Sequence, residues 1–162
     1  MATMSMLIAG NPRNSQRGFT YVMILVAVIA MGILTEVATT YASRVSQMDR
    51  EAELLFRGMA YRNAIKQYYE SGKPQKRYPQ SLVDLLKDPR TAAHKPYLRT
   101  LYTDPMGKDK GVWKIIRTID GGIYGVASSS SDVPIKTGNF KQGFEKFEGA
   151  KTYSDWTFDY VP

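Results

Sequence analysis

An uncharged, mostly apolar run occupies residues 18–35, between Arg17 and Glu36. These 18 residues would rise about 27 Å as an α-helix, which is close to the thickness of a bilayer's hydrocarbon core. Few other stretches of the chain are as apolar, and the remainder is polar, charged and rich in tyrosine. The pattern therefore predicts a membrane-spanning helix over this run and a soluble domain after it.

Helical periodicity continues beyond the apolar run. From residue 54 to residue 68 apolar and small residues recur at helical spacing, with arginine and lysine outside the stripe. Gly72 followed by Pro74 is a strong stop signal, so the sequence predicts one helix from about Phe19 to Glu70. Its predicted buried stripe comprises Leu54, Leu55, Gly58, Tyr61, Ala64, Ile65 and Tyr68.

The rest of the chain predicts a short helix and a small sheet. Ser81 and Asp84 form a capping-box pattern before a leucine-rich turn that ends ahead of Pro89. The pattern then changes to alternation over residues 112–119, 123–128 and 153–160, with a glycine-rich hairpin turn after the first of these and a polar loop before the last. In the last strand we expect Tyr153 on the face opposite Trp156 and Phe158. The expected fold class is α+β, with an antiparallel sheet laid on the long helix.

Composition and charge narrow the function classes. The chain has no cysteine, which excludes disulfides, thiolate metal sites and cysteine nucleophiles. The net charge of +7 comes from basic residues that are scattered among acids, and this argues against nucleic acid as a partner. The single histidine, His94, has no nucleophile motif around it, and no phosphate-binding glycine loop is present. We therefore expect a protein that is not an enzyme.

The segment RGFTYVMILVAV resembles the amino-terminal signature of type IV pilins and type II secretion pseudopilins. In that family a basic leader ends in glycine, and a prepilin peptidase cuts after the glycine and methylates the new terminus. The resemblance implies cleavage between Gly18 and Phe19, with N-methylation of Phe19. It divides the chain into a leader (1–18), a transmembrane and assembly helix (19–36) and a periplasmic pilin-like domain (37–162). The implied assembly residues are Phe19, Met23, Leu25, Val26 and Ile29.

Two further segments resemble parts of major pseudopilins. YPQSLVDLLKDPR is similar to the stretch after their long helix, and LYTDPMGK is similar to their aspartate-proline-x-glycine turn. Some of these relatives bind calcium in the loop before the last strand, and calcium takes oxygen ligands. The corresponding candidates here are Ser128, Ser130, Asp132 and Asp155, although the loop also carries lysines and an ordinary loop is the alternative. No other cofactor is expected.

Met23 departs from the family pattern. Most members carry glutamate at this fifth mature position, where it is thought to pair with the amino terminus of a neighbouring subunit. A chain with methionine there cannot form that pair, and an unpaired charge in a medium of low dielectric costs several kcal/mol. The departure favours a minor or tip subunit over the major repeating one.

The resemblance also implies a location and partners. The amino terminus would lie in the cytoplasm and the domain in the periplasm, anchored by one pass through the bacterial inner membrane; basic residues flank the span almost equally and do not decide the orientation. The expected partners are prepilin peptidase, other pilins or pseudopilins and the inner-membrane assembly platform of a secretion or pilus system.

Two alternatives remain open. One is a secretory signal cleaved near residues 38–43, and the other is an uncleaved anchor that carries a periplasmic module binding a ligand or DNA.

Overall fold

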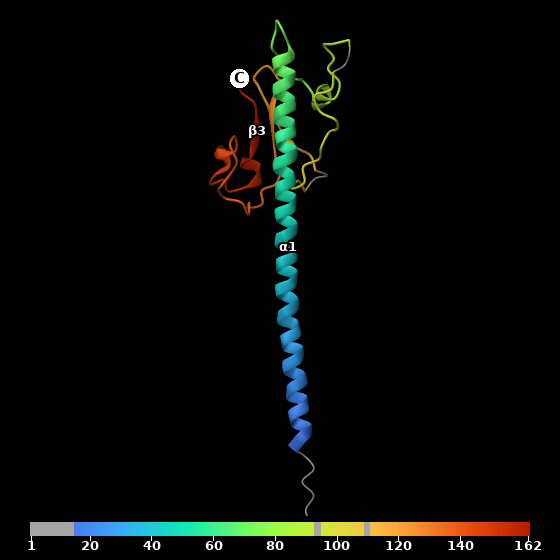
Figure 1. Cartoon of the computed structure of the whole chain (residues 1–162), viewed down its shortest axis with the longest axis vertical. Coiled ribbons are helices and arrows are strands. Elements are labelled where there is room, and N and C mark those ends of the chain that lie inside the picture. The colour runs from blue at the N-terminus through green and yellow to red at the C-terminus, as the bar shows by residue number, and fades with distance from the viewer. Residues whose placement is uncertain (1–14, 93–94, 109–110) are drawn as a thin grey trace, which may run out of the picture. The chain divides into compact units, whose positions relative to one another are not determined.

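The structure, a computed structural model, describes residues 15–92, 95–108 and 111–162 (Figure 1). The chain divides into two compact units, Met1–Arg44 and Val45–Pro162, and helix α1, Ser15–Ser71, contributes to both. The second unit adds a three-stranded sheet and three 3₁₀ turns. The expected α+β class and the long amino-terminal helix are confirmed, with α1 beginning four residues before Phe19 and ending one residue after Glu70.

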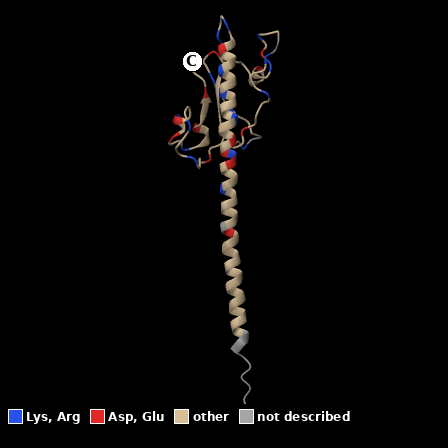
Figure 2. Cartoon of the chain, in the orientation of Figure 1, with Lys and Arg blue, Asp and Glu red and all other residues tan. Residues whose placement is uncertain are grey.

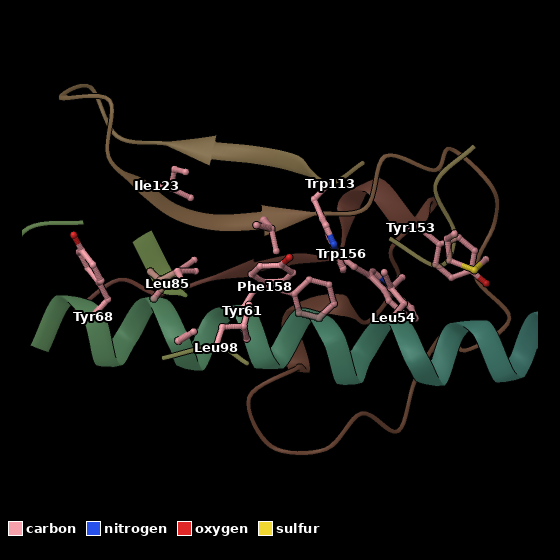
Figure 3. Packing of buried hydrophobic residues seen from close by; sticks show 14 of the residues in the cluster. Leu54, Tyr61, Tyr68, Leu85, Leu98, Trp113, Ile123, Tyr153, Trp156 and Phe158 are labelled. Atoms are coloured by element: carbon pink, nitrogen blue, oxygen red, sulfur yellow. The ribbon is translucent and has the colours of Figure 1, made fainter. Parts of the chain in front are cut away.

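The second half of α1 forms one side of the hydrophobic core. Leu54, Tyr61, Ala64, Ile65 and Tyr68 are buried, and Leu55 packs against them, as the stripe predicts. Figure 3 shows Leu54, Tyr61 and Tyr68 on the side of this helix that faces the sheet. The Tyr61 hydroxyl donates to the Tyr102 carbonyl oxygen at 2.9 Å, and burial raises the pKa of Tyr61 to about 12.

The sheet has the order β1-β2-β3 and is antiparallel throughout. Its strands are Lys114–Arg117, Ile123–Ala127 and Thr157–Asp159, each shorter than predicted. The pairing of β1 with β2 shifts register after Ile116, and the Ile123 N–H donates to the Pro79 carbonyl at 2.7 Å. Gly121 lies in the hairpin turn at φ +83°, a left-handed conformation that favours glycine.

The short second helix is reduced to one 3₁₀ turn, Leu82–Leu85, although its capping box through Ser81 and Asp84 is present. Pro89 has no N–H to donate to the Leu85 carbonyl, which an α-helix would require. That carbonyl instead accepts backbone hydrogen bonds from Tyr97 and Leu98 at 2.8 and 3.0 Å. The prediction of a longer helix is wrong because its next turn is replaced by these loop contacts.

The predicted alternation over residues 153–160 is also wrong in its first half. Tyr153–Asp155 forms a 3₁₀ turn, and only the following residues 157–159 form strand β3. Asp155 accepts from the Thr152 N–H at 2.9 Å, which closes this turn. As a result Tyr153 and Trp156 are both buried, three residues apart, where a strand would have placed them on opposite faces.

The loop over residues 129–149 is less polar in its packing than the sequence predicts. It contains a 3₁₀ turn, Glu145–Phe147, in which Phe147 is buried. The Phe147 ring stacks on Trp156 with centroids 5.4 Å apart and the planes 9° from parallel. Phe140 meets the same indole edge-on at 5.5 Å. Phe140, Phe144 and Phe147 thus make the predicted surface loop one side of the hydrophobic core.

Candidate functional site: the apolar helix half and the anchors of the domain

Residues 18–35 of α1 are exposed along their whole length. Phe19 is 70% exposed, and Met23, Leu25, Val26 and Ile29 are 43–64% exposed. Figure 2 shows that most of the charged residues of α1 lie in its second half, and residues 18–35 carry no charge. By length and composition this helix is apolar enough to cross a membrane, and a signal sequence near the amino terminus would meet the same criterion. An apolar surface of this extent needs lipid or another protein to cover it.

The predicted cleavage site lies near the beginning of α1. A Cβ atom built on Gly18 would have no atom within 4 Å, so packing in the described chain gives no reason for glycine there. Glycine in a helix costs about 1 kcal/mol relative to alanine. Gly18 therefore lowers the intrinsic stability of the helix, and no packing contact within the described chain compensates for it. Arg13 of the predicted leader lies outside the described residues.

Hydroxyl groups at the end of the apolar run are satisfied inside the helix. Thr35 Oγ1 donates to the Met31 carbonyl at 2.8 Å, and Thr39 and Thr40 both donate to the Glu36 carbonyl. Such bonds to the preceding turn remove the cost of placing a hydroxyl in an apolar medium. The Glu36 carboxylate has no ion pair within the described residues, and it is the first carboxylate along the sequence.

Glu51 is a buried carboxylate on the apolar face of α1. It accepts hydrogen bonds from the Tyr153 hydroxyl at 2.8 Å and from the N–H groups of Ile135 and Lys136 at 2.9 and 3.1 Å. Burial, together with the neighbouring carboxylate, raises the pKa of Tyr153 to about 12. Sequence analysis missed this anchor, although Glu51 falls three residues before Leu54 on the predicted stripe, and a carboxylate on a buried face is a signal of such a role.

Asp104 is a second buried anchor that sequence analysis missed. Its carboxylate accepts from the Met106 N–H, from Ser128 Oγ and from the Ser129 N–H, all at 2.8–2.9 Å. A Cβ atom on Gly107 would lie 3.0 Å from this carboxylate and 2.8 Å from Ser129 Oγ. The aspartate-proline-x-glycine turn thus ties the 104–107 loop to the end of β2, and the turn motif was the available signal.

Asp88 and Arg90 hold the carboxyl end of α1. The Arg90 side chain makes two hydrogen bonds to Asp88, at 2.8 and 2.9 Å, and donates to the Tyr68 carbonyl at 2.8 Å. Its guanidinium group also lies 3.6 Å above the Tyr68 ring. The Arg90 hydrogen bonds lower the pKa of the buried Asp88 to about 2. One arginine therefore donates to a carbonyl of the last helical turn, which also accepts from Ser71 Oγ at 2.9 Å, and neutralises a buried acid.

The four calcium candidates all have protein partners. Ser128 donates to Asp104, and Ser130 Oγ accepts from the Asp132 N–H at 3.2 Å. Asp132 pairs with Lys108 at 3.1 Å, which lowers its pKa. Asp155 accepts from backbone and side-chain groups of its own turn, chiefly the Thr152 N–H, which lower its pKa. Among residues 15–92, 95–108 and 111–162 no group of three or more histidine or acidic side chains is placed to hold a metal ion. His94 lies outside the described residues.

Comparison of the chain with protein-family models, with curated proteins and with solved structures gives no match.

Proposed function

We propose that the chain is a pilin-like structural subunit, anchored in the bacterial inner membrane and assembled through its apolar helix into a type II secretion pseudopilus or a type IV pilus. The observation that carries the proposal is that every one of residues 18–35 is exposed, in an uncharged helical run that the described chain leaves uncovered. In a membrane this surface is covered by lipid, and in a filament it is covered by the same run of neighbouring subunits.

The junction at Gly18 supports the same function. Glycine has no packing role there in the described chain, which leaves it accessible for recognition by another protein. A prepilin peptidase that cuts after Gly18 supplies that recognition. In this function the second unit, Val45–Pro162, displays loops to other subunits or to cargo, and the energy for assembly comes from partner proteins.

A second candidate function is a binding module on an uncleaved anchor. It is favoured by a polar depression of about 460 Å³ near the carboxyl end of α1. The depression is lined by two tyrosines and two cations, with polar groups from the β1–β2 turn. Its lining residues are Tyr69, Lys76, Arg77, Tyr78, Gln80, Thr118, Asp120 and Gly122.

Processing separates these two functions. Membranes that contain the full chain are incubated with and without a prepilin peptidase, and the protein mass is measured. The proposed function predicts loss of residues 1–18 only with the peptidase, and a block of that loss in Gly18→Val. Gly32→Val is the matched control, because Gly32 is also an open helical glycine, and it should be cut normally. An uncut wild-type chain would favour the binding module.

A further inference from the structure

An apolar groove runs along the second half of α1. It has a volume of about 580 Å³ and is open on one side. The α1 residues that line it share one helix face, and the opposite wall comes from the loop that ends in the Glu145–Phe147 turn. The lining residues are Ala52, Leu55, Phe56, Met59, Ala60, Asn63, Lys136, Phe140, Lys141 and Phe144. We call this set the domain groove.

The domain groove is basic at its edge and has no acid in its lining. Neither Lys136 nor Lys141 forms an ion pair with any residue in the described ranges; the Lys136 ammonium group lies 5.3 Å from the centre of the Phe140 ring. Phe56 is 62% exposed at the same place. A surface that combines exposed aromatic area with two unpaired cations fits a partner with an apolar face and a carboxylate.

The first half of α1 carries such a face. Ile33, Glu36, Thr40, Tyr41 and Arg44 line a shallow hollow of about 420 Å³, and we call this set the stalk face. Ile33 and Tyr41 are 60% and 71% exposed. Glu36 is the first carboxylate of the sequence and is unpaired within the described residues. The stalk face therefore carries exposed apolar area and, beside the cation Arg44, a carboxylate, which the lining of the domain groove lacks.

The two surfaces also match in spacing. Residues 33, 36, 40, 41 and 44 follow the steps i, i+3, i+7, i+8 and i+11, and residues 52, 55, 59, 60 and 63 of the domain groove follow the same steps. Each is one face of about three helical turns, long enough for side chains of one helix to pack between those of the other.

We infer that the domain groove receives the stalk face of a second copy of this chain, with Glu36 of that copy between Lys136 and Lys141. The α1 residues of the two surfaces follow one another along a single helix, Ser15–Ser71, so the contact joins different copies. The contact uses two different surfaces and is therefore heterologous, and its repetition gives an open chain of subunits unless the rotation between copies closes a ring.

This inference rests on the proposed function, in which neighbouring copies of a filament are offset along the helix axis, here by about 28 Å between residues 33–44 and residues 52–63, and it adds the residues that set the contact. The contact also pairs Glu36 of one copy with Lys136 and Lys141 of another. Met23 has no charge and cannot form an ion pair between copies. A contact between identical copies makes the chain a repeating subunit, contrary to the tip position that Met23 favours.

Cross-linking tests the contact directly, because the chain has no cysteine of its own. Two differently tagged full chains, Glu36→Cys and Lys141→Cys, are expressed together in membranes with the prepilin peptidase, and a short bis-maleimide is added. The expected product carries both tags. The control pair replaces Lys141→Cys with Lys87→Cys, an exposed lysine outside the domain groove, and should give at least tenfold less product.

Charge reversal gives an independent measurement. Glu36→Lys should lower the sedimenting, assembled fraction about tenfold, and adding Lys136→Glu with Lys141→Glu in the same chain should restore it. These outcomes support the contact.

Normal cleavage and assembly without the Glu36–Lys141 product, with Glu36→Lys neutral, would overturn the contact and leave the proposed function intact. A cross-link to a different protein would overturn the assignment of a second copy. An uncut chain that still forms the product would remove the proposed function and keep the contact.

Discussion

The Phe158 ring lies directly against Gly58 of α1, so close that a Cβ atom built on Gly58 would be 2.4 Å from its Cδ2 atom. Phe158 is the central residue of β3 and pairs with Val126 of β2. The absence of a side chain at one helix position therefore sets how closely the sheet approaches the helix. Phe158 also contacts Trp113 and Phe147 edge-on at 6.1 and 5.2 Å, so the ring has little room to move away.

Gly58→Ala should destabilise the second unit by about 2 kcal/mol, because the added methyl group overlaps a ring that is held on several sides. Urea unfolding of the full chain in detergent, followed by the fluorescence of the buried Trp113 and Trp156, measures this change. Gly32→Ala is the control, since its Cβ atom would meet nothing within 4 Å. Equal unfolding midpoints for Gly58→Ala and wild type would contradict the packing described here.

Glu51→Ala should cost about 3 kcal/mol in the free energy of unfolding. The change leaves the buried Tyr153 hydroxyl and the part-buried N–H groups of Ile135 and Lys136 without their acceptor, and a buried unsatisfied group costs about 1–3 kcal/mol. Glu53→Ala is a matched control two residues away, because Glu53 forms only a partly exposed ion pair with Arg57 and should cost less than about 1 kcal/mol. If the two variants unfold alike, Glu51 does not anchor the loop.

Asp88 should make the domain sensitive to acid. Its pKa is about 2 in the folded chain against an ordinary 3.8, so its contribution is complete above about pH 5 and is lost as the pH falls through 2. The difference corresponds to about 2 kcal/mol. Asp88→Asn should therefore be less stable than wild type at pH 6, and the gap should narrow at pH 2. Urea unfolding at both values measures it, with the exposed Asp120→Asn as control; a gap that is the same at both values would contradict the ion pair.

Met23→Glu tests the position of the subunit in a filament. If methionine marks a tip subunit, glutamate restores the carboxylate that can pair with a neighbouring amino terminus, and the amount of chain in sheared filaments should change by about tenfold. Immunoblots of the sheared and membrane fractions measure the amount. Met31→Glu, another exposed methionine of the same run, serves as control for the cost of any added charge in the membrane. Unchanged incorporation would count against a tip role.

The sequence was sufficient for the elements that periodicity controls. The stripe from Leu54 to Tyr68 predicted the buried face of α1 because helical spacing alone determines which side chains share a face. The hairpin at Gly121 was predictable because few residues other than glycine adopt its φ. The apolar run that forms the candidate assembly surface was equally visible, since it depends only on composition.

The features that were missed depend on contacts between distant segments. The burial of Tyr153 and Trp156 together follows from the 3₁₀ turn closed by Asp155, which local alternation does not reveal. Phe140, Phe144 and Phe147 read as isolated aromatics in a polar loop, and only the packing around Trp156 joins them into a wall. The domain groove was missed for the same reason, because its second wall comes from that loop.

The central claim, a pilin-like subunit processed after Gly18, is tested most directly by the mass of the amino-terminal peptide. The protein is taken from its native membrane, with and without an active prepilin peptidase, and digested for mass spectrometry. The proposed function predicts a peptide that begins at N-methylated Phe19 and that disappears when the peptidase is absent. A peptide that still carries residues 1–18 in the presence of the peptidase would contradict the claim and would leave an anchored binding module as the better account.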